Sequence, residues 1–210
     1  MSSIDRYKSG FFFSPEFIGD NSWNGYEHNL LFECIGPGQY TDVARPLGCD
    51  AIEDSRGVAI ADFNSDGLLD IVVCNNNSQP TIYLNKVQGA GNWLRVKLIA
   101  GADCNRDAIG SRVEVVVSKG AKKQTFTRWV EAGTGYAAQS DMRIHIGLGA
   151  TNEIDSLTVT WPNGERQTFD SEKLIGCVNH SLEIEQRVNQ VSKPGNRDVA
   201  NVTQQTAGRE

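Results

Sequence analysis

Residues 57–73 read Gly-Val-Ala-Ile-Ala-Asp-Phe-Asn-Ser-Asp-Gly-Leu-Leu-Asp-Ile-Val-Val. The runs on either side of the acidic centre, residues 58–61 and 71–73, are rich in β-branched residues, which favour strands. Between them lie several acidic residues and Gly67, which allows a sharp turn. This stretch therefore predicts two strands joined by an acidic loop.

Oxygen-bearing side chains occupy positions one, three, five and nine of the loop: Asp62, Asn64, Asp66 and Asp70. With the backbone carbonyl of Leu68 they would supply most of a calcium shell, because Ca²⁺ prefers several oxygen ligands. An EF-hand would need a bidentate Glu at position twelve, where this chain has Val73, and helices on both sides. We expect calcium to act as a structural clamp; an Asx-rich turn that binds no ion is the alternative.

The first part of the chain has further strand-type runs. Residues 29–32, 57–61, 69–74 and 81–84 are separated by clusters of Gly, Asn and Asp. Four such strands make about one blade of a β-propeller, whereas a closed propeller needs several. One blade leaves open edges, so we expect homo-oligomerisation or docking to a larger complex.

Beyond residue 92, apolar and polar residues alternate with a period of two. The pattern is present at 94–98, 113–117 and 157–161, and it predicts strands with one buried face. Residues 118–121 are expected to close one hairpin, and Pro162-Asn163-Gly164 another, because Asn-Gly favours tight primed turns. The expected fold is all-β, a partial propeller-type repeat followed by a small antiparallel β-sandwich.

A glycine-containing connector, Val-Gln-Gly-Ala-Gly-Asn at 87–92, marks the expected domain boundary. We predict an N-terminal segment and repeat over 1–88 and a β domain over 89–187. Residues 188–210 contain no aromatic and few apolar residues, so this tail is expected to be disordered.

The composition of the chain argues against a membrane helix, nucleic-acid binding and a zinc site. The 210 residues carry a net charge of -6, with no apolar run near the roughly 18 residues of a membrane helix. The densest basic run, Lys119, Lys122 and Lys123, is too sparse for nucleic acid and is expected to be a solvated hairpin tip. The five cysteines include no C-x-x-C pair, so free thiols are favoured over a zinc site or disulfide framework.

Two parts of the chain resemble known families. Residues 29–32, 38–44 and 57–70 are similar to the FG-GAP/VCBS repeats of integrin-type β-propellers. After the connector, six blocks occur in the order seen in ASPIC/UnbV domains, among them Asn105-Arg106-Asp107-Ala108-Ile109-Gly110, Gly133-Thr134-Gly135-Tyr136 and His145-Ile146-Gly147-Leu148-Gly149. Together these parts look like the C-terminal end of a CRTAC-type protein. The resemblance implies calcium binding and an extracellular or periplasmic location, although the chain has about one repeat and no visible signal sequence.

Several further residues are candidates for binding a ligand or partner. In the second part these are Asn105, Arg106, Asp107, Tyr136 and Asp141, whose polar and aromatic groups would suit a glycan or a protein. A structural role is the alternative for each of them. The aromatic run Phe11, Phe12 and Phe13 is expected to pack on the open repeat or to dock a partner.

The sequence thus favours a calcium-binding, non-enzymatic module for protein interaction or assembly. The alternatives are an enzyme or an accessory subunit of a biosynthetic pathway, and a glycan-binding adhesion module. No catalytic residue is assigned, because the dispersed histidines and the absence of a Gly-x-Ser-x-Gly elbow give nucleophilic hydrolysis no support.

Overall fold

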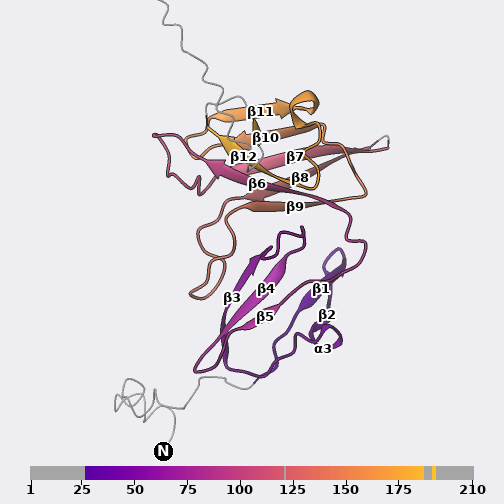
Figure 1. Ribbon diagram of the computed structural model, residues 1–210, viewed down its shortest axis with the longest axis vertical. Helices are drawn as coiled ribbons and strands as arrows, with labels where there is room; N and C mark the ends of the chain where they lie inside the picture. Colours follow the sequence, from indigo (N-terminus) through magenta and orange to yellow (C-terminus); the bar gives the residue numbers. More distant parts are fainter. Residues whose placement is uncertain (1–26, 121, 187–190, 193–210) are drawn as a thin grey trace, which may run out of the picture. The chain divides into compact units, whose positions relative to one another are not determined.

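The computed structural model describes residues 27–120, 122–186 and 191–192, and its regular structure is almost entirely β (Figure 1). The expected all-β fold class is therefore confirmed. The chain forms two units. The first comprises residues 1–86 and 133–141, and the second comprises residues 87–132 and 142–210.

The first unit contains two small antiparallel sheets. Its elements are β1 (Phe32–Gly36), β2 (Gln39–Asp42), α3 (Ala44–Leu47), β3 (Ser55–Ala61), β4 (Asp70–Asn75) and β5 (Thr81–Tyr83). The strands β3, β4 and β5 form a three-stranded sheet in that order. A strand over 29–32 is wrong, because β1 begins at Phe32 and the turn through Gly38, whose φ is 69°, folds it onto β2.

The second unit is built from two four-stranded sheets. One has the order β11-β10-β7-β8, with β7 (Arg112–Lys119), β8 (Lys122–Trp129), β10 (Ser156–Thr160) and β11 (Arg166–Asp170). The other has the order β13-β12-β6-β9, with β6 (Asn92–Ile99), β9 (Ile144–Gly149), β12 (His180–Glu185) and β13 (Val191–Ser192). A short 3-10 turn, η2 (Ser171–Leu174), follows β11.

Both predicted hairpins of the second unit are present, but the tight primed turn expected at Asn163-Gly164 is wrong. Gly164 has a φ of 87° whereas Asn163 has no positive φ, and Pro162 and Asn163 are the central residues of a turn closed by the N–H of Gly164 and the carbonyl of Trp161. The β7 and β8 strands pair antiparallel up to the turn, with Lys119 opposite Lys122, and β10 pairs with β11 from Thr160 opposite Arg166. One pairing departs from the antiparallel sandwich that the sequence predicts: β6 and β12 run parallel, His180 facing Leu94. Parallel strands need a long connection. Here the connection from β6 to β12 includes all four strands of the other sheet.

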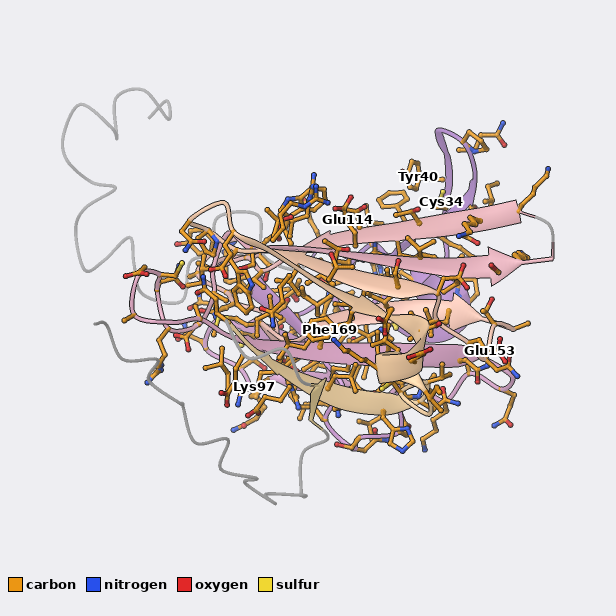
Figure 2. All side chains as sticks on the ribbon, turned by 90° about the horizontal axis from the view of Figure 1, so that it is seen from above. Cys34, Tyr40, Lys97, Glu114, Glu153 and Phe169 are labelled. Carbon is orange, nitrogen blue, oxygen red and sulfur yellow. The ribbon has the colours of Figure 1, made fainter. Side chains whose placement is uncertain are left out.

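The hydrophobic core lies between the two sheets of the second unit. Alternating residues of β7, Val113, Val115 and Val117, are buried there, as are Trp161 and Phe169. Figure 2 labels Phe169 among these inner side chains and Glu114 on the outer side of its sheet. The buried Trp161 also satisfies its ring nitrogen, which donates a hydrogen bond to Gln167 Oε1 at 3.1 Å. This core makes the second unit a stable frame for its surface residues.

Candidate functional site

The acidic loop joins β3 to β4, as its flanking residues predict. Asp62 is 4% exposed and its carboxylate accepts the backbone N–H groups of Asp66 and Gly67 at 3.1 and 3.0 Å. The loop turns through Ser65 and Gly67, whose φ angles are 61° and 87°. The buried charge of Asp62 is therefore compensated by donors from within the loop.

Three oxygen-bearing side chains, those of Asp62, Asn64 and Asp66, come together in the first half of this loop. Asp62 Oδ1 and Asn64 Oδ1 both accept the N–H of Asp66, and the Asn64 amide donates to Asp66 Oδ2 at 2.7 Å. Carboxylate and amide oxygens that converge in this way suit a hard cation such as Ca²⁺. The Asp66 carboxylate also accepts the N–H of Leu68 at 2.8 Å, so it already holds the turn together.

Asp70 has different surroundings from these three residues. It is fully buried, and its two carboxylate oxygens accept the N–H of Phe63 at 2.9 Å and the N–H of Asn85 at 2.8 Å. Within the described ranges no group of three or more His, Cys, Asp or Glu side chains is placed to hold a metal ion. Asp62, Asn64 and Asp66 are the loop residues whose polar side chains converge, while Asp70 ties the loop to the chain that follows β5.

A second feature of the first unit is the loop of residues 133–141, which lies against the free edge of β3. Ser140 Oγ accepts the N–H of Ile60 at 3.1 Å, and the N–H of Asp141 donates to the carbonyl of Ile60 at 3.0 Å. Thr134 Oγ1 donates to the same Ser140 Oγ at 2.9 Å. The loop thereby satisfies a backbone edge that would otherwise be open.

Two of the predicted binding residues belong to this loop. Asp141 pairs through its backbone with β3, whereas the side chain of Tyr136 is 77% exposed. The backbone carbonyl of Tyr136 lies close to Gly57, where an added Cβ would be only 3.3 Å from that oxygen. The close approach explains why β3 carries a glycine at this point.

A groove of about 430 Å³ lies on the first unit. Its floor is the face of the sheet that carries Val58, Ile60, Ile71 and Val73, which face one another across β3 and β4. Tyr83 and Cys49 also line it. Burial raises the pKa of both groups, and for Tyr83 the nearby Cys49 and acidic residues raise the pKa further.

The first unit has little core of its own. In its described part the buried apolar residues are Ala44 and Val73, whereas the second unit contains the whole hydrophobic cluster. Large apolar side chains stay exposed on both faces of the sheet, with Val58 at 43% and Ile60 at 39% on one face and Ile82 at 59% on the other. The sheet of the first unit thus leaves apolar side chains in contact with solvent.

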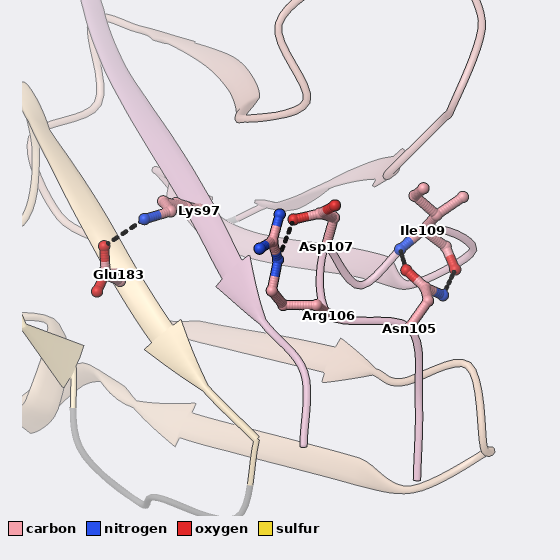
Figure 3. A network of polar contacts seen from close by, with 6 residues as sticks. All are labelled: Lys97, Asn105, Arg106, Asp107, Ile109 and Glu183. Atoms are coloured by element: carbon pink, nitrogen blue, oxygen red, sulfur yellow. Dashed lines mark hydrogen bonds and ion pairs between the residues drawn. The ribbon is translucent and has the colours of Figure 1, made fainter. Parts of the chain in front are cut away.

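The remaining predicted residues of the second unit lie in one loop between β6 and β7 (Figure 3). The side chain of Asn105 closes the loop with two hydrogen bonds to the backbone of Ile109. Its Oδ1 accepts the N–H of Ile109 at 2.7 Å, and its amide donates to the Ile109 carbonyl at 2.9 Å. Arg106 and Asp107 pair with each other at 3.3 Å, with the arginine side chain 87% exposed. Asn105 thus has a structural role in the loop, and Arg106 presents its charge to solvent.

The predicted binding residues are divided between the two units. Asn105, Arg106 and Asp107 belong to the second unit, whereas Tyr136 and Asp141 belong to the first. Phe11, Phe12 and Phe13 lie outside the described residues.

Two features escaped the sequence reasoning. Nothing in the sequence signals that residues 133–141 bind β3, because the partners are about 80 residues apart. The exposed Trp129 could have been found, because alternation along Thr125, Phe126, Thr127 and Arg128 puts it on the threonine side of the strand.

Comparisons with known proteins agree with this architecture. Residues 101–191 match the family model described as ASPIC and UnbV. Cartilage acidic protein 1 of Xenopus tropicalis is 35% identical over 176 residues, which cover 80% of this chain and 26% of that protein. Cartilage acidic protein 1 of Homo sapiens is 33% identical over 157 residues, which cover 73% of this chain and 21% of that protein. The chain thus spans about a quarter of the length of these relatives. The part that the structure describes has no helix long and apolar enough to cross a membrane.

Proposed function

Because this chain carries an ASPIC/UnbV domain and is homologous to cartilage acidic protein 1, we propose that it is a non-enzymatic module for protein interaction or assembly, stabilised by calcium. In this proposal the first unit is one FG-GAP/VCBS-type repeat of a larger β assembly. The second unit is the stable domain that accompanies it.

The observation that carries the proposal is the uncovered sheet of the first unit. A three-stranded sheet with Ile60 exposed on one face and Ile82 on the other, and with almost no core of its own, gains stability when further β structure covers either face. Covering chain can come from a second copy or from the rest of a longer protein, and the relatives are about four times as long as the matched region.

Calcium has a specific role in this proposal. It binds the oxygens of Asp62, Asn64 and Asp66 and holds the turn between β3 and β4. Binding to the folded state alone stabilises it by about 2.7 kcal/mol when the free ion is at 100 times its dissociation constant. The same ion also relieves repulsion between the two carboxylates of this turn.

The calcium role is tested by thermal melts in EDTA and in excess calcium. We expect calcium to raise the melting temperature reversibly, and we expect Asp66→Asn to remove most of that shift. Glu33→Gln is the matched control, because Glu33 is an exposed carboxylate on β1 of the same unit. Equal melting in EDTA and calcium would reduce the loop to an Asx-rich turn.

The assembly role is tested by light scattering. We expect a mass above the 23.0 kDa of one chain, and we expect Ile60→Lys to lower it. Ile175→Lys is the control, because Ile175 is 79% exposed in the second unit and the sheet of the first unit does not contain it. A monomer at every concentration would contradict self-assembly.

A further inference from the structure

The outer face of the β11-β10-β7-β8 sheet carries a row of side chains that the proposed function does not use. Pairing across the four strands places Trp129, Arg112, Thr160 and Arg166 side by side. Adjacent strands are about 4.8 Å apart, so the row is roughly 14 Å long. Every one of these residues lies in the second unit.

Trp129 is the unusual member of this row. It is 55% exposed, and among the described residues of the second unit it is the one large exposed apolar side chain that belongs to a strand. An exposed indole gains no free energy from burial until a ligand covers it, and its flat face suits the apolar side of a sugar ring.

Two polar atoms in the same row have no hydrogen-bond partner. The Nε atom of Arg112 and the Oγ1 atom of Thr160 are buried and have no hydrogen-bond partner. Unsatisfied buried donors and acceptors are rare in proteins. Because these two atoms are buried, they do not face solvent, and the accessible polar groups of the row are the exposed parts of the Arg112 and Arg166 side chains.

The next row of the same face continues the polar surface. It consists of Thr127, Glu114, Thr158 and Thr168, opposite one another on the four strands. The two threonine hydroxyls of β10 and β11 lie 3.1 Å apart. Hydroxyls and a carboxylate in this arrangement can exchange hydrogen bonds with the hydroxyl groups of a saccharide.

The two rows together carry two arginines and one carboxylate, although the whole chain is acidic. Arg112 and Arg166 share one carboxylate, Glu114, whose Oε2 lies 3.0 Å from Nη2 of Arg112 and 3.9 Å from Nη2 of Arg166. The Arg166 side chain is 64% exposed, and its planar guanidinium suits carboxylate or sulfate groups. The chain as a whole has a net charge of -6, so this face differs in sign from the average surface.

We propose that this face binds an anionic polysaccharide, with Trp129 stacking on a sugar ring and with Arg112 and Arg166 binding its carboxylate or sulfate groups. A second copy of the chain is a poor occupant, because two such faces would bring arginine against arginine. The inference goes beyond the proposed function, since it uses neither the calcium loop nor the exposed sheet of the first unit.

The test is affinity electrophoresis and calorimetry of the full chain, without added calcium, at low and at physiological salt. The probes are polygalacturonate, which carries carboxylates, dextran sulfate, which carries sulfates, and uncharged dextran. We expect at least one charged probe to bind and dextran not to bind. Comparison of the two charged probes shows whether the face binds carboxylate groups or sulfate groups.

Variants distinguish this face from general attraction of polyanions. We expect Trp129→Ala and Arg166→Gln each to weaken binding about tenfold, the effect of losing roughly 1.4 kcal/mol. Tyr40→Ala is the matched control, because Tyr40 is 65% exposed on β2 of the first unit, and it should bind like the wild type.

Two results would overturn the proposal. One is the absence of binding to both charged probes. The other is equal binding by the wild type and by Trp129→Ala, provided that a thermal melt shows the variant to be folded. If Trp129→Ala does not fold, Arg166→Gln still tests the proposal. The Arg166 side chain is largely exposed, so this substitution should not disturb folding.

Discussion

Ser140 provides the sharpest test of how the first unit is held together. Its hydroxyl oxygen accepts two hydrogen bonds, from the N–H of Ile60 at 3.1 Å and from Oγ1 of Thr134 at 2.9 Å. Ser140→Ala removes both bonds and keeps the backbone hydrogen bond from the N–H of Asp141 to the carbonyl of Ile60.

The expected magnitude follows from these two contacts. A neutral hydrogen bond contributes about 0.5–1.5 kcal/mol, and the Thr134 hydroxyl can rotate toward water, so we expect a local loss of about 1–2 kcal/mol. Since 1.4 kcal/mol is a factor of ten, the amide of Ile60 should exchange its hydrogen roughly tenfold faster. The core of the second unit is separate, so its exchange should not change.

Hydrogen–deuterium exchange with mass spectrometry measures this effect on peptides that cover β3. Ser140→Thr keeps a hydroxyl and should restore slow exchange at least in part. Ser78→Ala is the matched control, because Ser78 lies exposed in the turn before β5 of the same unit. If Ser140→Ala leaves exchange at β3 unchanged, the loop of residues 133–141 does not protect that edge.

Two further predictions concern each unit separately. Gly91→Ala should destabilise the second unit strongly, because Gly91 has a φ of 81° and an added Cβ would lie 2.7 Å from the carbonyl oxygen of Gly149. Gly89→Ala is the control and should cost less stability, because Gly89 has a φ of 70° but open space around it. Urea unfolding measures both losses of stability, and equal losses would contradict this reasoning. Because burial raises the pKa of Tyr83 in the folded state, the stability linked to this group is present below its unfolded pKa of about 10 and is lost as pH rises through the folded value. Tyr83→Phe should therefore make the decline of the melting temperature above pH 10 shallower, and an identical decline in both proteins would contradict the assigned environment.

Local sequence pattern was sufficient for much of the fold. Alternation at residues 113–117 predicts the inward-facing valines of β7, and the Asn163-Gly164 turn predicts the β10–β11 hairpin. Both depend on neighbours in sequence, where strand period and turn preference act directly. The same holds for the loop that begins at Asp62, because β-branched runs flank it on both sides.

Contacts between distant residues could not be predicted in this way. Alternation shows that one side of a strand is buried but does not say which strand lies beside it, so the parallel pairing of β6 with β12 was not foreseen. The row from Trp129 to Arg166 likewise depends on the register of four strands.

The sequence by itself therefore determined which segments form strands with one buried face, where the acidic loop lies, and where the two hairpins of the second unit turn. Only the tertiary structure decided that Ser140 binds the edge of β3 and that Trp129 lies beside Arg112, in a row of side chains that ends at Arg166. The physical reason is that side-chain period and turn chemistry act over a few residues, whereas packing and strand register bring together residues whose separation in sequence carries no local signal.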